Sequence, residues 1–76
     1  MATAYLKVWV EVGKETAVRD ALKKLKGVKR CDLTTGDQDI IVLIDAPDYQ
    51  SLLDMILTSV RSVQGIERTV TNLVLE

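Results

Sequence analysis

A run of five apolar residues at positions 40–44, Ile-Ile-Val-Leu-Ile, constrains this 76-residue chain more than any other feature. An unbroken run of β-branched residues and leucine, bounded by polar turn residues, is typical of a strand that is buried on both faces. A chain this short has few residues with which to cover both faces of a sheet. We therefore expect helices on one face of this strand and a second copy of the chain on the other.

The segment 34–39, Thr-Thr-Gly-Asp-Gln-Asp, directly precedes the apolar run. Glycine, aspartate and threonine favour a tight polar turn, because they adopt unusual backbone angles or hydrogen-bond to the nearby main chain. Backbone N–H groups around Gly36 and the carboxylates of Asp37 and Asp39 could bind a small polar molecule. From the residues alone, a plain hairpin turn is the simpler interpretation.

The composition excludes several classes of function. Ten Lys and Arg residues balance eleven Asp and Glu residues, so no basic surface for nucleic acid is predicted. The chain has no histidine and one cysteine, Cys31, which excludes histidine-based catalysis, the common zinc sites and an intrachain disulfide. We expect no catalytic residue, no cofactor and no metal, and interpret Cys31 as a small packing residue.

Alternating apolar and polar residues predict a first strand over residues 5–12, with its even-numbered side chains on one face. Residues 14–26 carry apolar side chains at helical spacing and are followed by Gly27, which predicts the first helix and its end. Residues 28–35 form a second and more polar strand, which suits the edge of a sheet.

A second helix is predicted to begin at Pro47, because the first turn of a helix does not need the N–H group that proline lacks. Gly65 ends this helix, and residues 66–75 form the fourth strand. The segments 25–30 and 63–68 resemble each other, so the chain reads as two similar halves. The predicted apolar stripe of the second helix comprises Tyr49, Leu52, Leu53, Ile56, Leu57, Val60 and Val63.

The predicted order of strand, helix, strand, strand, helix, strand is that of the ferredoxin-like α+β fold, in one domain over residues 1–76. Right-handed crossovers place both helices on one face of a four-stranded antiparallel sheet. The other face stays uncovered, and an uncovered apolar face predicts contact with a second copy of the chain. The residues predicted at this dimer interface are Tyr5, Trp9, Ile41 and Leu43.

Several functions are found on this fold, so the site has to distinguish them. A metal-carrying version needs a Cys-x-x-Cys pair, and this chain has a single cysteine. An RNA-binding version needs exposed aromatic residues in basic surroundings, and no such basic surface is predicted here. A cofactor-free enzyme needs a base in a cleft, and the residues offer no clear one. A small-ligand sensor built at subunit contacts remains, with a purely structural assembly module as its first alternative and a cofactor-free dimeric enzyme of this fold as a weaker one.

The residues 25–28, 35–39 and 63–71 resemble the effector-binding domain, or RAM module, of Lrp/AsnC-type transcription regulators. Leu52 and the apolar residues 73–75 fit the same pattern, so the resemblance spans positions 4–75 in order. Gln38 stands where this family usually has an aromatic residue. The resemblance implies a stand-alone effector domain, without the helix-turn-helix domain that such regulators carry before it.

The resemblance also implies a ligand and partners. Family members bind amino acids where dimers meet, so we expect an amino acid effector and a homodimer that assembles into a higher oligomer. A full-length Lrp/AsnC regulator is an expected partner, with no direct DNA binding. From the sequence itself, which shows no signal peptide and no apolar stretch long enough to span a membrane, we expect no membrane contact and a cytoplasmic location. Asp39 or Asp37 would accept the ligand's ammonium group. The residues implied at the ligand site are Thr35, Gly36, Asp37, Gln38, Asp39, Thr69 and Thr71.

Overall fold

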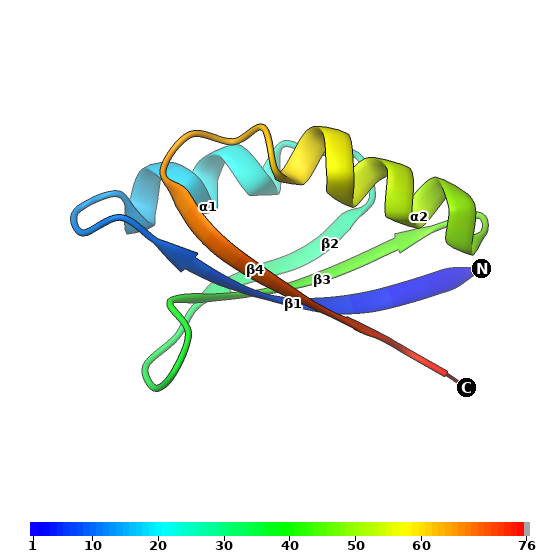
Figure 1. Cartoon of the computed structure of the whole chain (residues 1–76), viewed down its shortest axis with the longest axis horizontal. Helices are drawn as coiled ribbons and strands as arrows, with labels where there is room; N and C mark the ends of the chain where they lie inside the picture. Colours follow the sequence, from blue (N-terminus) through cyan, green and yellow to red (C-terminus); the bar gives the residue numbers. More distant parts are fainter. Residues whose placement is uncertain (76) are drawn as a thin grey trace.

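The computed structural model describes residues 1–75 as one antiparallel sheet with two helical segments across one of its faces (Figure 1). This arrangement confirms the predicted ferredoxin-like α+β fold. The elements are β1 (Ala2–Val10), α1 (Glu15–Lys23), β2 (Val28–Leu33), β3 (Ile40–Ala46), α2 (Tyr49–Met55), the π-helical segment η1 (Ile56–Val60) and β4 (Ile66–Leu73).

The strand order across the sheet is β2-β3-β1-β4, so β1 and β3 are central and β2 lies at an edge, as predicted. β1 pairs antiparallel with β3 on one side and with β4 on the other. It begins earlier than predicted, because Ala2 already pairs with Ala46 of β3, and it ends earlier because Lys14 N donates to Glu11 O and the chain turns there. Val12, predicted to share one face of the strand with the other even-numbered residues, is 97% exposed in this turn.

β2 and β4 each end two residues before their predicted limits. Thr34 N donates to Asp39 O at 2.9 Å, and this bond begins the loop that joins β2 to β3. The first helix is also shorter than predicted, because α1 gives way to a turn at Lys24 that leads into Gly27. The predicted element types are right, and only their ends are wrong.

The second helix begins at Tyr49, directly after its N-cap Asp48, rather than at Pro47. The Oδ1 atom of Asp48 accepts a hydrogen bond from the backbone N–H of Ser51 at 2.8 Å, which makes Asp48 the N-cap. This bond lowers the pKa of the Asp48 carboxyl. After Met55 the helix widens into η1, where Arg61 N donates to Ile56 O five residues earlier.

The predicted apolar stripe of the second helix is wider than the buried one. Leu52, Ile56 and Val60, at four-residue spacing, are buried against the sheet. Tyr49, Leu53 and Leu57 repeat the same spacing one position later, and they are 40–59% exposed. The apolar stripe therefore includes a second row of residues that the sheet does not fully bury.

The hydrophobic core lies between the two helices and the sheet. β3 contributes its alternate residues Ile40, Val42 and Ile44, all fully buried, whereas Ile41 and Leu43 point to the other face and are half-buried. That second face of the sheet carries no helix in residues 1–75, and we call it the open face (Figure 1). The sequence predicts that β3 is buried on both faces. In the single chain, β3 is fully buried only on the face that the helices cover.

Candidate functional site

The hairpin loop, residues 34–39, projects past the end of the sheet between β2 and β3 (Figure 1). Its base is closed by side chains as well as by the main chain. Thr34 Oγ1 donates to the carbonyl oxygen of Gln38 at 3.2 Å, and the amide Nε2 of Gln38 donates back to Thr34 Oγ1 at 3.0 Å. Gln38 thus closes the base of the loop through hydrogen bonds to Thr34.

Asp39 fastens the hairpin loop to β1. Its backbone N–H donates to Val8 O at 3.0 Å, and its Oδ2 atom accepts from the backbone N–H of Val10 at 2.9 Å. The second bond occurs where the pairing of β1 with β4 shifts register between Trp9 and Val10. Asp39 therefore has a structural role, and one of its two carboxylate oxygens is already engaged by the main chain.

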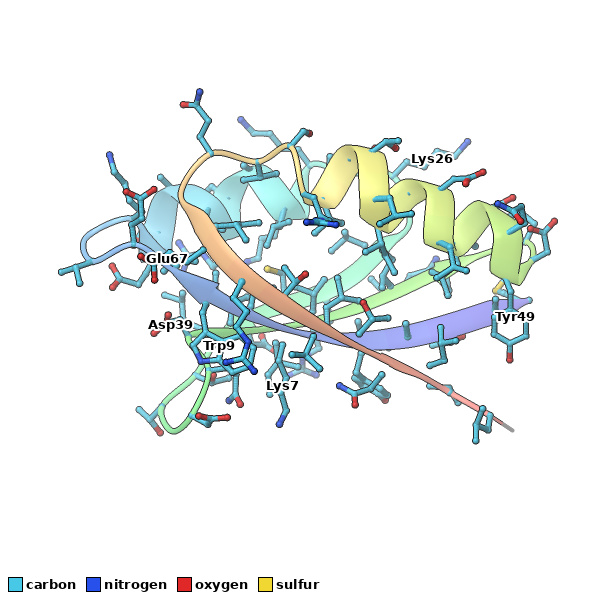
Figure 2. The ribbon with its side chains drawn as sticks, viewed as in Figure 1. Lys7, Trp9, Lys26, Asp39, Tyr49 and Glu67 are labelled. Atoms are coloured by element: carbon cyan, nitrogen blue, oxygen red, sulfur yellow. The ribbon has the colours of Figure 1, made fainter. Side chains whose placement is uncertain are left out.

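Trp9 reaches the hairpin loop from the open face. Its indole Nε1–H donates to the carbonyl oxygen of Asp37 at 2.7 Å, and the guanidinium carbon of Arg68 lies 4.4 Å from the ring centroid. Figure 2 shows Trp9 and Lys7 on the side of the sheet away from the helices, with Asp39 close to Trp9. The Asp37 side chain itself stays exposed at the tip.

The threonines of β4 lie on the helix face of the sheet. Thr69 pairs with Val8 and Thr71 with Leu6, and paired residues share a face. α2 packs over β3 and β1, so the helix face of β4 is left partly uncovered beside it. The space between η1, which continues α2, and β4 measures about 510 Å³, and we call it the α2/β4 groove. It is lined by Ile56, Leu57, Arg61, Ile66, Glu67, Arg68, Thr69 and Thr71.

One chain does not bring the two sets of predicted site residues together. The hairpin loop leads into β3, the threonines lie on β4, and β1 runs between these two strands. The loop residues 35–39 thus form one cluster at the end of the sheet. Thr69 and Thr71 form a second cluster in the α2/β4 groove.

Arg61 is a groove residue that the sequence prediction missed. It is exposed, and it forms no salt bridge with any residue in the described range 1–75. A signal for it existed, because Arg61 is the only charged residue between Asp54 and Glu67. A guanidinium beside two threonine hydroxyls and an apolar wall suits a small carboxylate with an aliphatic chain.

The residues predicted at a dimer interface do lie together on the open face. Tyr5 pairs with Leu43 across β1 and β3, and Tyr5 is 48% exposed. Ile41 and Leu43 are half-buried, and with Tyr5 they line a shallow depression of about 300 Å³ at this face. Trp9 lies on the same face, near its end. This arrangement leaves a small apolar patch in the centre of the sheet, beside Arg30 and Asp32 of β2, which line the same depression.

Cys31 is buried in the core on β2, where burial raises the pKa of its thiol. Its Sγ atom lies 3.9 Å from the carbonyl oxygen of Arg19 on α1, which agrees with a packing role. Among residues 1–75, no three His, Cys, Asp or Glu side chains gather in a group that could hold a metal ion. No helix in that range is long and apolar enough to cross a membrane.

Comparison with curated proteins finds relatives among enzymes. The chain is 39% identical over 61 residues to a homocitrate synthase of Sulfurisphaera tokodaii, and the match covers 80% of this chain but 13% of the enzyme. A homocitrate synthase of Saccharolobus solfataricus is 38% identical over the same length and coverage. The chain therefore corresponds to a small part of these enzymes.

Solved structures share the whole fold. The TTHA0845 protein of Thermus thermophilus has a TM-score of 0.94 at 28% identity, and the match covers all of this chain and 95% of that one. The transcriptional regulator NMB0573 of Neisseria meningitidis, solved in complex with L-Met, has a TM-score of 0.85 at 19% identity, over 99% of this chain and 50% of that one. The sequence model of the Lrp/AsnC ligand binding domain matches residues 3–76, and the chain belongs to this family of regulatory ligand-binding domains.

Proposed function

We propose that this domain binds a free amino acid at contacts between copies of the chain and that binding shifts their assembly. The observation that supports the proposal is that the predicted site residues fall into two separate clusters in one chain, which we interpret as two half-sites. The hairpin loop offers exposed backbone at Gly36 and the exposed carboxylate of Asp37. The α2/β4 groove offers two threonines and the guanidinium of Arg61, which has no ion-pair partner among residues 1–75. β1 keeps these halves apart within one chain.

The two half-sites are chemically complementary to a zwitterion. The carboxylate of Asp37 would accept the ligand's ammonium group in a charge-assisted hydrogen bond. Arg61 and the hydroxyls of Thr69 and Thr71 would hold its carboxylate. Ile56, Leu57 and Ile66 would contact an apolar side chain, which favours an aliphatic amino acid over a charged one.

Assembly would begin at the open face. Its apolar centre, formed by Tyr5, Ile41 and Leu43, would pack against the same face of a second chain in a dimer with two-fold symmetry. Dimers would then associate so that the hairpin loop of one chain enters the α2/β4 groove of another. A ligand that contacts both would stabilise the larger assembly by its differential affinity.

The partner of such an assembly is a separate proposal. One candidate is a full-length Lrp/AsnC regulator, in line with the matched half of the Neisseria meningitidis transcriptional regulator. The similarity to 61 residues of archaeal homocitrate synthases supports a second candidate, a biosynthetic enzyme that the domain regulates. A purely structural assembly module is the alternative to both, and it would show the same oligomer without a saturable ligand.

The function is tested by a thermal-shift screen of the wild-type chain against each of the twenty L-amino acids. We expect aliphatic amino acids to raise the melting temperature, because a ligand that binds the folded form stabilises it in proportion to the logarithm of its concentration. Arg61→Gln should abolish the shift. Arg19→Gln, an arginine on α1 outside both half-sites, is the matched control and should keep it. No shift with any amino acid would favour the structural alternative.

A further inference from the structure

Trp9 joins three parts of the fold that are distant in the sequence. It lies on β1, donates its indole N–H to the Asp37 carbonyl at 2.7 Å, and carries the Arg68 guanidinium of β4 over its ring. Figure 2 shows its side chain beside the base of the hairpin loop. The loop, the central strand and the edge strand β4 are thus connected through one side chain.

The tip of the hairpin loop depends on this connection. The base is held by bonds of Thr34, Gln38 and Asp39, but these leave residues 35–37 outside. Within the described residues 1–75, the indole is the only donor from outside the loop that reaches the tip. The Cα of Gly36 faces open space, since a Cβ added there would meet nothing within 4 Å. Packing therefore does not replace the indole's hydrogen bond.

We propose that Trp9 is a positioning residue that orders the hairpin loop for ligand binding, and that Arg68 holds the indole in place. This inference rests on the proposed amino-acid function, because it concerns the same loop. The hydrogen bond fixes the edge of the ring, and the cation on its face restricts its rotation. A loop that is already ordered loses less conformational entropy when a ligand binds, so the affinity rises.

Arg68 is among the residues that line the α2/β4 groove, but its guanidinium lies over the Trp9 ring on the open face. Trp9 is the only tryptophan, so its fluorescence reports on this contact directly.

The positioning role is tested by ¹⁵N relaxation on the full chain. Trp9→Phe keeps an aromatic ring on β1 but removes the N–H donor. We expect the order parameters of Gly36 and Asp37 to fall from about 0.85 in the wild type to below about 0.6 in this variant. Tyr5→Phe, on the same strand and face, is the matched control and should leave them unchanged. Arg68→Gln should give an intermediate fall. Unchanged order in Trp9→Phe would overturn the inference.

A calorimetric titration with each of the twenty L-amino acids tests whether this order serves binding. At a temperature where both proteins are fully folded, Trp9→Phe should bind roughly three- to tenfold more weakly, as expected for a lost neutral hydrogen bond. Equal affinities, together with a disordered tip, would overturn the role in binding. If no amino acid binds the wild type, the proposed function is wrong, and the order parameters alone then support or overturn the positioning of the loop.

Discussion

Asp39 holds the last residue of β1 through its side chain, because its Oδ2 atom lies 2.9 Å from the backbone nitrogen of Val10. Because of this bond, we expect the two aspartates of the hairpin loop to have different roles. Asp39 secures the backbone where the ladder to β4 is irregular. Asp37 projects from the tip, where its side chain is exposed and a ligand could reach it.

The first prediction separates these roles. Asp39→Ala should destabilise the fold by about 1–3 kcal/mol, because the N–H of Val10 loses its acceptor in a partly buried position. Asp39→Asn retains an acceptor oxygen and should cost less. Asp37→Asn should leave the unfolding free energy unchanged and weaken amino-acid binding. Urea unfolding and calorimetry measure the two quantities, and the reverse pattern would show that the roles are exchanged.

The second prediction compares two glycines with positive φ. Gly13, at φ +87°, has open space around it, and Gly13→Ala should cost only the left-handed backbone, about 1–2 kcal/mol. Gly27, at φ +96°, lies where an added Cβ would come within 2.8 Å of Asp45 O and 2.9 Å of the Met55 sulfur. Gly27→Ala should therefore be clearly more destabilising in urea unfolding. Equal losses would mean that Met55 and the β3 backbone move aside at no cost.

The third prediction concerns neighbouring leucines on α2. Leu52 is fully buried, and Leu52→Ala should cost about 2–5 kcal/mol of unfolding free energy. Leu53 is 40% exposed, and Leu53→Ala should change stability by no more than about 0.5 kcal/mol in the monomer. A large loss at Leu53 that grows with protein concentration would place this row of α2 in a contact between chains.

The fourth prediction follows from the N-cap of α2. The hydrogen bond from Ser51 N–H lowers the pKa of the Asp48 carboxyl, so the folded form prefers the ionised group. The stabilisation is present above the ordinary pKa of aspartate, about 3.9, and is lost as the pH falls through the folded pKa. Asp48→Asn keeps an acceptor without a charge. The difference in melting temperature between the two proteins should therefore shrink below about pH 4, and a constant difference would contradict this linkage.

Much of the fold could be predicted from the sequence, because apolar periodicity and glycine stops mark each element locally. The ends of β1 and of the second helix could not, since they depend on bonds between distant residues or on a cap. Glu11 N donates to Gly65 O across the fold, and Asp48 takes the cap position next to Pro47. The exposure of Tyr49, Leu53 and Leu57 could not be predicted either. Apolar character alone does not show which of two adjacent rows on a helix packs against the sheet.

The candidate site was predictable in its residues but not in its geometry. The hairpin loop and the β4 threonines were named from a resemblance, and the structure places them on opposite sides of β1. The roles of Trp9 and Arg61 required the structure. An indole that donates to a loop 28 residues away leaves no local signature, and the isolation of Arg61 in the sequence does not reveal the groove that it lines.

The central claim is that the domain binds an amino acid with both half-sites, and the most direct measurement is a calorimetric titration of the aliphatic L-amino acids into wild type, Arg61→Gln and Thr71→Val. The proposed site predicts saturable binding to the wild type and loss of binding in Arg61→Gln. Thr71→Val should bind more weakly by about 0.5–1.5 kcal/mol, the net value of one neutral hydrogen bond. Light scattering on the same samples should show the assembly growing with ligand. Saturable binding that is unchanged in both variants would contradict the proposed site, and the absence of binding to the wild type would contradict the function.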